Sequence, residues 1–266
     1  MNINDKTMCG ESLMAGNLTG RIIGKEKFNT CFYYSFSVKI FIFPCMIEPL
    51  IFYPPLLHGK YLDDFLAIGF YRMGQGIFST HYLIVNEQVH EVNWLRYDIS
   101  SISFGKSIKK IIRMNSSFTA IIKPLIITEE IENLYSNYKT GINFDPAASV
   151  QQWLQEEKDC NVYDSYMIEV RDGKLLIAVG IFDKGENSIA GIMNFYHPAY
   201  KKYSLGKYLM LLKVKYAAAK NIEWSYPGYI VNGYSKFDYK LFIGHSSASI
   251  YQPGKKEWVP YDKTSI

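Results

Sequence analysis

The sequence is poor in cysteine, and its four cysteines do not form a metal-site pattern. In a chain of 266 residues they are scattered, with no Cys-x-x-Cys pair. This spacing fits a reduced protein better than a disulfide framework or a zinc site. The five histidines form no ligand-like cluster with acids or cysteines either, so the sequence implies no zinc and no other cofactor.

An apolar run long enough to cross a bilayer is also missing. The most apolar segment, 32–52, is interrupted by Lys39, Pro44 and Glu48 and follows the mostly polar residues 1–31. It fits neither a signal peptide nor a membrane span. We therefore expect a soluble, cytoplasmic protein that does not interact with membranes.

Acidic residues are scarce in two segments. Residues 201–240 hold eight lysines against Glu223 and Asp238, a net charge of +6, whereas the whole chain carries +4. Residues 99–128 contain no acid, and their cations are Lys106, Lys109, Lys110, Arg113 and Lys123. Two basic zones interleaved with Tyr and Phe are typical of a polyanion-binding surface. A solvated basic face is the alternative.

The composition changes near residue 46. Residues 1–45 lack a clear period and hold three of the four cysteines, whereas regular turn signals begin at Met46. We expect an N-terminal extension at 1–45, a smaller α/β domain at 46–127 and a larger domain at 128–266. Met46 is a candidate for the true start of the protein, which N-terminal sequencing of the native protein would test.

Hydrophobic spacing predicts the elements of the first half. Apolar positions recur at helical spacing over 57–67, and Gly69 ends that helix. Residues 77–85 and 89–97 are predicted to be extended segments.

The second half is predicted to begin with helices and continue as a sheet. Thr128 is a suitable N-cap for a helix that reaches Gly141, and a shorter helix follows at 150–154. Turn residues then separate three strands of an antiparallel meander, predicted at 163–170, 175–183 and 188–196.

A helix over 205–220 follows the meander, with Ser204 available as N-cap and Asn221 as its end. The strand predicted at 222–226 should lie parallel to its neighbour, because a helix that crosses a sheet normally returns a parallel strand. A splayed pair of strands there would form a cleft. The order of elements predicts an α+β, acetyltransferase-like (GNAT) mixed sheet with flanking helices.

The start of this helix is suited to an anion. The backbone N–H groups of Leu205, Gly206 and Lys207 have no partner within the helix, and Gly206 has no side chain to obstruct a ligand. The alternative is a Ser-capped helix that tolerates a surface lysine.

Three segments together resemble the C-terminal domain of arginyl-tRNA–protein transferases. They are Tyr-His-Pro-Ala-Tyr-Lys-Lys-Tyr-Ser-Leu-Gly-Lys-Tyr at 196–208, Trp-Ser-Tyr-Pro-Gly-Tyr-Ile at 224–230, and Lys-Phe-Asp-Tyr-Lys at 236–240. Their order and spacing match the family's Pro-x-Tyr loop, Ser-Leu-Gly-x-Tyr helix start, Gly-Tyr strand end and Met-x-Tyr-Lys element. Phe237 stands where the family has Met. Fainter similarity extends over 57–243.

One departure from the family bears on its N-terminal domain. The family usually has cysteines there, close to an Arg-x-x-Gly segment, whereas residues 79–94 contain none. An iron–sulfur or thiol-based regulatory element is therefore not expected. A divergent N-terminal domain also leaves leucine open as the transferred amino acid in place of arginine.

The resemblance implies an aminoacyltransferase that uses charged tRNA, as in protein arginylation and the N-degron pathway. The α-amino group of a protein that begins with Asp or Glu attacks the aminoacyl ester carbonyl at the tRNA 3′ end. This aminolysis needs no covalent enzyme intermediate and no cofactor, because positioning the amine and stabilising the oxyanion supply most of the catalysis. The expected partners are aminoacyl-tRNA and acceptor proteins with N-terminal Asp or Glu.

The resemblance and the chemistry of the residue types together suggest three sets of site residues. The expected catalytic residues are Asp183 as base, His197 as proton shuttle and Tyr203. The expected acceptor-binding residues are Arg72, Tyr229, Lys236, Tyr239 and Lys240. The expected tRNA-binding residues are Lys201, Lys202, Ser204, Gly206, Lys207 and Tyr208. Structural alternatives are a turn-capping Asp, a surface His, an internally paired Arg and core tyrosines.

Two other functions remain open at this level. A coenzyme A-dependent N-acetyltransferase would use a similar helix start, although 204–206 offers a single glycine. A non-catalytic tRNA- or protein-binding relative is the second alternative. Bound coenzyme A would favour the first, and tRNA binding without transfer the second.

Overall fold

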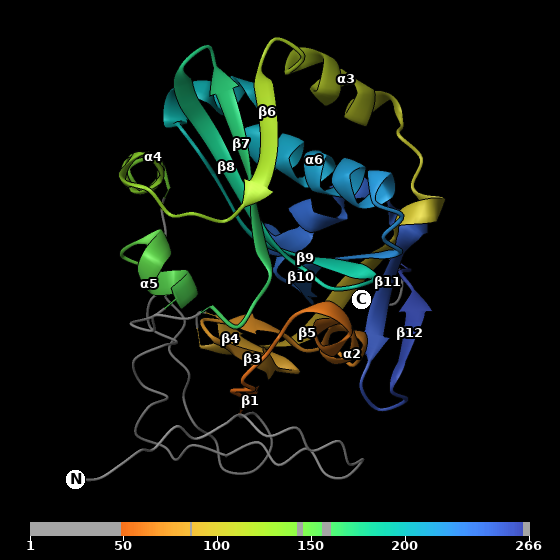
Figure 1. Cartoon of the computed structure of the whole chain (residues 1–266). Coiled ribbons are helices and arrows are strands. Elements are labelled where there is room, and N and C mark those ends of the chain that lie inside the picture. The colour runs from red at the N-terminus through yellow and green to blue at the C-terminus, as the bar shows by residue number, and fades with distance from the viewer. Residues whose placement is uncertain (1–48, 86, 143–145, 156–160, 263–266) are drawn as a thin grey trace, which may run out of the picture.

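The computed structural model describes residues 49–85, 87–142, 146–155 and 161–262 (Figure 1). The predictions for 1–45, for a start at Met46 and for the four cysteines lie outside these residues.

The centre of the fold is a nine-stranded mixed sheet. Its strands follow the order β12-β11-β5-β10-β9-β8-β7-β6, and β4 pairs with β5. The strands are β4 (Tyr82–Val85), β5 (Gln88–Asp98), β6 (Thr119–Pro124), β7 (Ser165–Asp172), β8 (Leu175–Lys184), β9 (Ser188–Tyr196), β10 (Trp224–Val231), β11 (Ala248–Gln252) and β12 (Glu257–Pro260). The predicted meander is confirmed, since β7, β8 and β9 pair in sequence and run antiparallel.

A small antiparallel sheet lies against the central one (Figure 1). It has the order β1-β3-β2 and consists of β1 (Leu50–Phe52), β2 (Tyr71–Met73) and β3 (Gly76–Ser79). Helix α2 (Gly59–Ala67) joins it to a buried cluster that includes Tyr163 and Tyr226 of the central part. Gly69 adopts φ +78 after this helix, as its predicted end requires.

The predicted extended segment 77–85 is two strands in the structure. β3 joins the small sheet, whereas β4 pairs with β5. Between them the Thr80 hydroxyl donates to the Tyr82 carbonyl at 2.8 Å and forms a local turn. Apolar alternation continues on both sides of this turn, so the pattern alone did not show the break.

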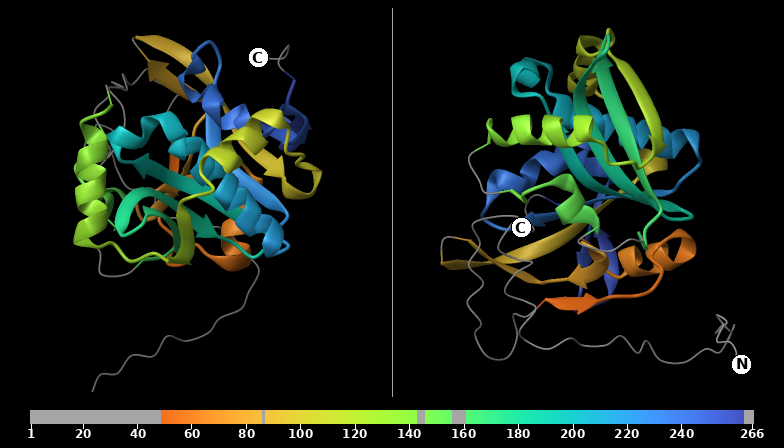
Figure 2. Two further views of the ribbon diagram at one scale, coloured as in Figure 1. Left: turned by 90° about the horizontal axis from the view of Figure 1, so that it is seen from above. Right: turned by 60° about the vertical axis from the view of Figure 1, so that its left-hand side comes forward.

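Helices cover both faces of the central sheet (Figures 1 and 2). α6 (Leu205–Ala219) and α3 (Lys106–Met114) cover one face, and α4 (Glu129–Lys139) and α5 (Val150–Gln155) cover the other. The alternation along β7 fits this arrangement: Ile168 packs with the α6 cluster and Met167 with the α4 cluster.

The helix ends explain where α4 and α6 lie. The Thr128 hydroxyl accepts the Ile131 N–H, which confirms this N-cap. Asn221 adopts φ +55, and the Ile222 N–H reaches the Ala217 carbonyl at 2.9 Å, which is a Schellman end. Ser204 occupies the N-cap position of α6 but is left-handed, with φ +54, and makes no side-chain cap bond. The predicted capping bond is therefore wrong, because Ser204 instead links α6 to the preceding 3-10 helix η3 (Pro198–Tyr203).

The predicted parallel crossover is confirmed. α6 leads from β9 to β10, and these strands pair in parallel from Trp224–Tyr226 to 188–190. The sheet also continues across the predicted division at 127/128, because β6 pairs with β7, and β5 lies between β10 and β11.

The remaining 3-10 helices are η2 (Ile99–Ser101), η4 (Ser235–Ile243) and η5 (His245–Ser247). None of the helices in the described ranges has the length and apolar character needed to cross a bilayer.

Candidate active site

The site begins where two central strands separate. β9 and β10 pair over only three residues each, 188–190 and 224–226, although both strands continue beyond them. The register of β10 against β5 shifts between Ser225 and Gly228, and that of β9 against β8 shifts opposite Ile181 and Phe182. Both shifts lie at the same level of the sheet as the separation. We call this region the fork.

A cavity of about 700 Å³ opens at the fork. Its wall includes β9 residues 191–196, β10 residues 227–229, the start of α6, and aromatic side chains from α4. η4 contributes Lys236, Tyr239 and Lys240. The cleft that a splayed pair would form therefore lies at this separation.

Tyr71 closes the apex of the fork. Its hydroxyl donates to the Gly191 carbonyl on β9 and lies 3.2 Å from the Tyr226 carbonyl on β10. One phenol thus bridges the two separating strands. Burial raises the pKa of Tyr71 well above its usual value, so the phenol stays neutral and remains a donor.

Lys213 of α6 lies deep in the cavity wall and is 4% exposed. Its Nζ donates to the carbonyls of Ile181 at 2.7 Å and Met193 at 3.1 Å, beside the register shift of β8 and β9. Among the described residues no carboxylate forms an ion pair with it. Burial therefore lowers the pKa of Lys213 to about 7, against an opposing effect of Asp183.

A pKa lowered to about 7 suits Lys213 to proton exchange near neutral pH. Two of its N–H bonds point to backbone carbonyls, and the remaining position on Nζ carries a proton or a lone pair. A group with a pKa near 7 populates both forms at physiological pH, which suits it to general acid–base catalysis.

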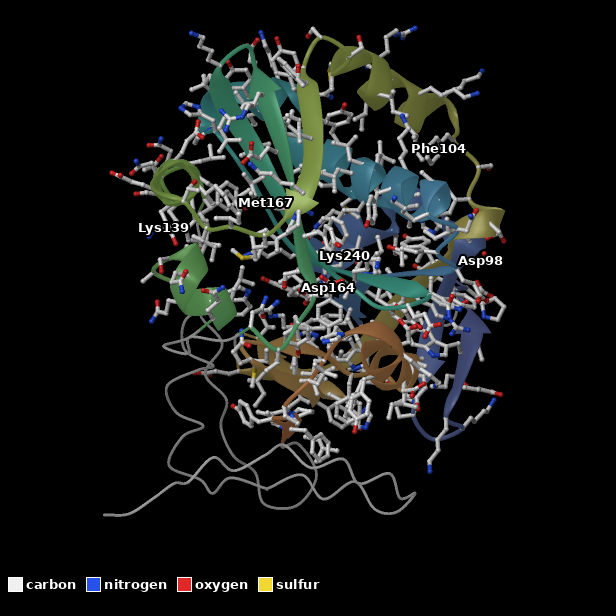
Figure 3. All side chains as sticks on the ribbon, in the orientation of Figure 1. Asp98, Phe104, Lys139, Asp164, Met167 and Lys240 are labelled. Atoms are coloured by element: carbon white, nitrogen blue, oxygen red, sulfur yellow. The ribbon has the colours of Figure 1, made fainter. Side chains whose placement is uncertain are left out.

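Lys240 of η4, labelled in Figure 3, is a second lysine in the cavity wall and is partly buried. Its Nζ donates to the Tyr229 carbonyl at 2.7 Å and lies 4.7 Å and 4.9 Å from the ring centres of Tyr229 and Phe237. Within the described ranges it has no carboxylate partner at ion-pair distance, and desolvation lowers its pKa to about 7. The same burial raises the pKa of Tyr229 to about 12.

Gly228 makes room for Lys240. It adopts φ +99, and a Cβ built there would lie 3.2 Å from Lys240 Nζ. A side chain at this position would strain the backbone and press on the ammonium group. The Pro-Gly-Tyr of β10 therefore shapes the cavity floor.

The structure brings Arg72 and Asp183 together, but they pair with each other. Arg72 Nη1 lies 2.8 Å from Asp183 Oδ1, and both side chains are almost fully buried. The guanidinium also donates to Ser165 and to the carbonyls of Gly74 and Leu154. Arg72 borders the cavity with these donors already engaged, whereas Asp183 is outside the cavity wall.

Asp183 is thus enclosed in a charged network that serves the core. Burial raises the pKa of the Asp183 carboxyl, and Arg72 and Ser165 act in the opposite direction. To grip an acceptor carboxylate with Arg72, or to deprotonate an amine with Asp183, this pair would first have to open. Both roles stay predictions, and the geometry favours the internally paired alternative.

Of the other predicted residues, four lie outside the cavity wall. His197 Nδ1 accepts the Ala199 N–H at 3.2 Å and caps η3. The Tyr203 ring packs edge-on against Phe118 at 4.9 Å. Lys202 is exposed on η3, and Tyr208 is buried in the α6 core.

The remaining predicted residues do line the cavity. They are Tyr229, Lys236, Tyr239 and Lys240 from the acceptor set, and Lys201, Ser204, Gly206 and Lys207 from the tRNA set. The α6 start therefore faces the cavity, as an anion-binding role requires. A Cβ added at Gly206 would make only ordinary contact, 3.6 Å from the Tyr196 ring.

Sequence reasoning missed Tyr71 and Lys213. Lys213 was counted with the basic zone, although it interrupts an apolar run from Tyr208 to Val214. A lysine inside such a run is a signal for burial. Tyr71 carried no comparable signal, because its role depends on carbonyls 120 and 155 residues away in the sequence.

The chain is similar to proteins of known families. A family model described as "Arginine-tRNA-protein transferase, C terminus" matches residues 130–248. An aspartate/glutamate leucyltransferase of Shewanella sp. (strain MR-4) is 28% identical over 207 residues, covering 75% of this chain and 85% of the relative. One from Pseudoalteromonas atlantica is 24% identical over 217 residues, covering 76% and 90%.

This family match and these relatives support the aminoacyl-tRNA–protein transferase family for the chain. The matched transferase domain runs from α4 to the first residue of β11 and so contains the fork, Lys213 and Lys240. Tyr71 lies outside this match, in the N-terminal part that completes the transferase cavity.

Solved structures give only a weak likeness to this transferase chain. The C-terminal domain of a putative lysylphosphatidylglycerol synthetase from Agrobacterium fabrum has a TM-score of 0.42 and 9% identity, covering 57% of this chain and 52% of that one. The L-PGS structure from Bacillus licheniformis has a TM-score of 0.34 and 9% identity, covering 52% of this chain and 48% of that one.

Proposed function

We propose that this chain transfers leucine, with arginine as the alternative, from charged tRNA to the α-amino group of proteins that begin with Asp or Glu. The family match and the relatives named aspartate/glutamate leucyltransferase support this activity. The observation that carries it is a cavity lined by the buried Lys213 and the partly buried Lys240, neither paired with a carboxylate among the described residues.

Lys240 is the proposed partner of the acceptor's acidic side chain. Its ammonium lies at the cavity wall between Tyr229 and Phe237 and has no carboxylate of its own in the described structure. A bound Asp or Glu carboxylate would supply the missing charge and raise the pKa of Lys240 back toward its usual value. An acceptor without that carboxylate would leave the lysine uncompensated, which gives selectivity.

Lys213 is the proposed proton carrier. The neutral α-amino group attacks the ester carbonyl carbon, and the tetrahedral intermediate then breaks its bond to the ribose oxygen. One proton must leave the nitrogen and one must reach that oxygen. Lys213 accepts the first and returns a proton to the second, so it ends unchanged.

The aminoacyl-tRNA 3′ end is proposed to enter past the α6 start. Lys201 and Lys207 line this side, and both are exposed to solvent. Phosphate contacts there, together with aromatic side chains deeper in the cavity, match the chemistry of an unpaired RNA end. No cofactor is needed in this scheme, and the supply of charged tRNA places the reaction in the cytoplasm.

We also propose that the central sheet is of the acetyltransferase-like (GNAT) class. The support is its parallel, splayed β9–β10 pair joined by α6, with the cavity at the separation. Acyl transfer at such a fork suits the proposed reaction.

Transfer of radiolabelled amino acid tests the function. Leucyl- and arginyl-tRNA are each offered with peptides that begin with Asp, Glu, Lys or Ala, and acetyl-coenzyme A is offered in parallel. We expect label from leucyl-tRNA on the acidic peptides. Transfer from acetyl-coenzyme A alone, or none from a folded protein, would contradict the proposal.

A further inference from the structure

Helix α3 carries a row of cations on one face. Lys106, Lys109, Lys110 and Arg113 are spaced at i, i+3, i+4 and i+7, and all four are exposed. The opposite face contributes Ile108 and Ile111 to the core. Within the described residues none of the four cations forms an ion pair.

This row costs stability in the free protein. Like charges three or four residues apart on a helix repel each other, and the four residues form four such pairs. α3 spans only nine residues, too few for a helix that is stable by itself, so packing of its apolar face must hold it in place. A bound polyanion would turn this repulsion into attraction.

The end of α3 that follows Arg113 lies against η3, which borders the cavity. At the end of α3 the fully buried Asn115 donates to the Tyr203 carbonyl at 3.0 Å, which ties this helix to η3. The Phe118 ring also packs against Tyr200 at 5.9 Å. η3 carries exposed Lys201, which borders the cavity. α3 and the start of α6 thus adjoin on one side of the sheet (Figure 1).

We propose that the α3 face of Lys106, Lys109, Lys110 and Arg113 binds the double-stranded acceptor stem of tRNA. This inference rests on the proposed function and adds the position of the stem. α3 contains no aromatic residue that could stack on an unpaired base. Its cations therefore suit the phosphates of a duplex. The aromatic cavity beyond Lys201 takes the unpaired 3′ end.

Binding of uncharged tRNA tests the stem site directly. The double variant Lys109→Gln/Lys110→Gln is compared with wild type and with Lys255→Gln/Lys256→Gln, which removes the same charge from the β11–β12 turn. We expect about tenfold weaker binding at 0.1 M salt, and a logarithmic salt slope smaller by about two, only for the α3 variant. Thermal unfolding should show no loss of stability, because two repelling cations are removed.

A second measurement separates this inference from the proposed function. Transfer from full-length leucyl-tRNA should lose efficiency through a higher KM, while transfer from a leucylated tetranucleotide of the 3′ end should be unchanged in the α3 variant. If wild type transfers from neither donor, the proposed function fails, and the tRNA affinities still decide the stem site.

Two results would overturn the stem site. One is tRNA affinity and a salt slope in the α3 variant equal to those of wild type. The other is binding to phosphatidylglycerol vesicles that depends on Lys109 and Lys110 while tRNA binding does not.

Discussion

Two sets of buried or partly buried cations near the fork differ in how their charge is compensated. Arg72 is paired with Asp183 at 2.8 Å and has further acceptors in Ser165 and two carbonyls. Lys213 and Lys240 contact only carbonyl oxygens and aromatic rings in the described structure. A compensated charge is complete within the fold, whereas an uncompensated one is poised for a ligand or a proton.

The largest expected effect is on turnover, from Lys213→Met. Loss of a proton-transferring group typically costs about 10²–10⁴-fold in kcat. Met matches the side-chain volume, and loss of the buried charge partly offsets the two carbonyls left without a donor. Steady-state kinetics and thermal unfolding are measured together.

Lys215→Met is the matched control, because Lys215 is exposed on the same helix. This variant should leave kcat and the thermal unfolding temperature unchanged. Wild-type kcat in a folded Lys213→Met protein would remove Lys213 from the chemistry.

Stability should respond most to Asp183→Asn. This change leaves the Arg72 guanidinium buried without its counter-charge, which costs about 3–5 kcal/mol. Urea denaturation measures the free energy of unfolding. The double variant Arg72→Met/Asp183→Leu should recover much of the loss, since it removes both charges.

Asp183→Asn should differ from Lys213→Met in its effect on activity. Per folded molecule, kcat of Asp183→Asn should stay within a few-fold of wild type. A loss comparable to that of Lys213→Met, with stability unchanged, would make Asp183 the base that the sequence predicted.

Gly228→Ala should have a smaller effect that falls on acceptor binding. The added Cβ would lie 3.2 Å from Lys240 Nζ, at a backbone φ of +99 that alanine rarely adopts. We expect about a tenfold rise in KM for acidic peptides, with little change in the KM for leucyl-tRNA. Gly173→Ala, in the open β7–β8 turn at φ +58, controls for backbone strain alone.

The smallest effect expected is on the pH dependence of stability. The pKa of Lys240 is about 7 in the folded chain, below its usual 10.5, so between these values the unfolded state binds more protons. Stability therefore rises as pH increases from 7, by about 1 kcal/mol up to pH 8 for this lysine. Lys240→Met should lose that increment in urea denaturation, and an unchanged pH profile would place the folded pKa near 10.5.

Local patterns predicted much of the fold. Thr128, Gly69 and Asn221 end or begin helices at the positions expected, and the turns of the meander separate β7, β8 and β9 as predicted. These features depend on a few neighbouring residues and on the spacing of apolar residues, which is two in a strand and 3.6 in a helix. The parallel pairing of β9 and β10 also followed from a general rule on crossovers.

What sequence could not supply were contacts between distant segments. α3 at 106–114 is not among the predicted helices, although Ile108, Ile111 and Ile112 recur at helical spacing. Asp183 and Arg72 were both selected as polar residues near matched motifs, but their mutual pairing depends on a fold contact across 111 residues. Burial of Lys213 likewise depends on the strands beneath α6, so composition counted it as a surface charge.

The most direct test of Lys240 as the group that binds the acceptor's carboxylate compares two acceptor peptides. One begins with Asp and the other with its neutral isostere Asn. Leucine transfer from leucyl-tRNA is measured for wild type, Lys240→Met and Lys236→Met. The account predicts that wild type prefers Asp by about tenfold or more and that Lys240→Met abolishes this preference by losing activity on Asp alone. A Lys240→Met protein that keeps the preference, or a Lys236→Met protein that loses it instead, would contradict the assignment of Lys240.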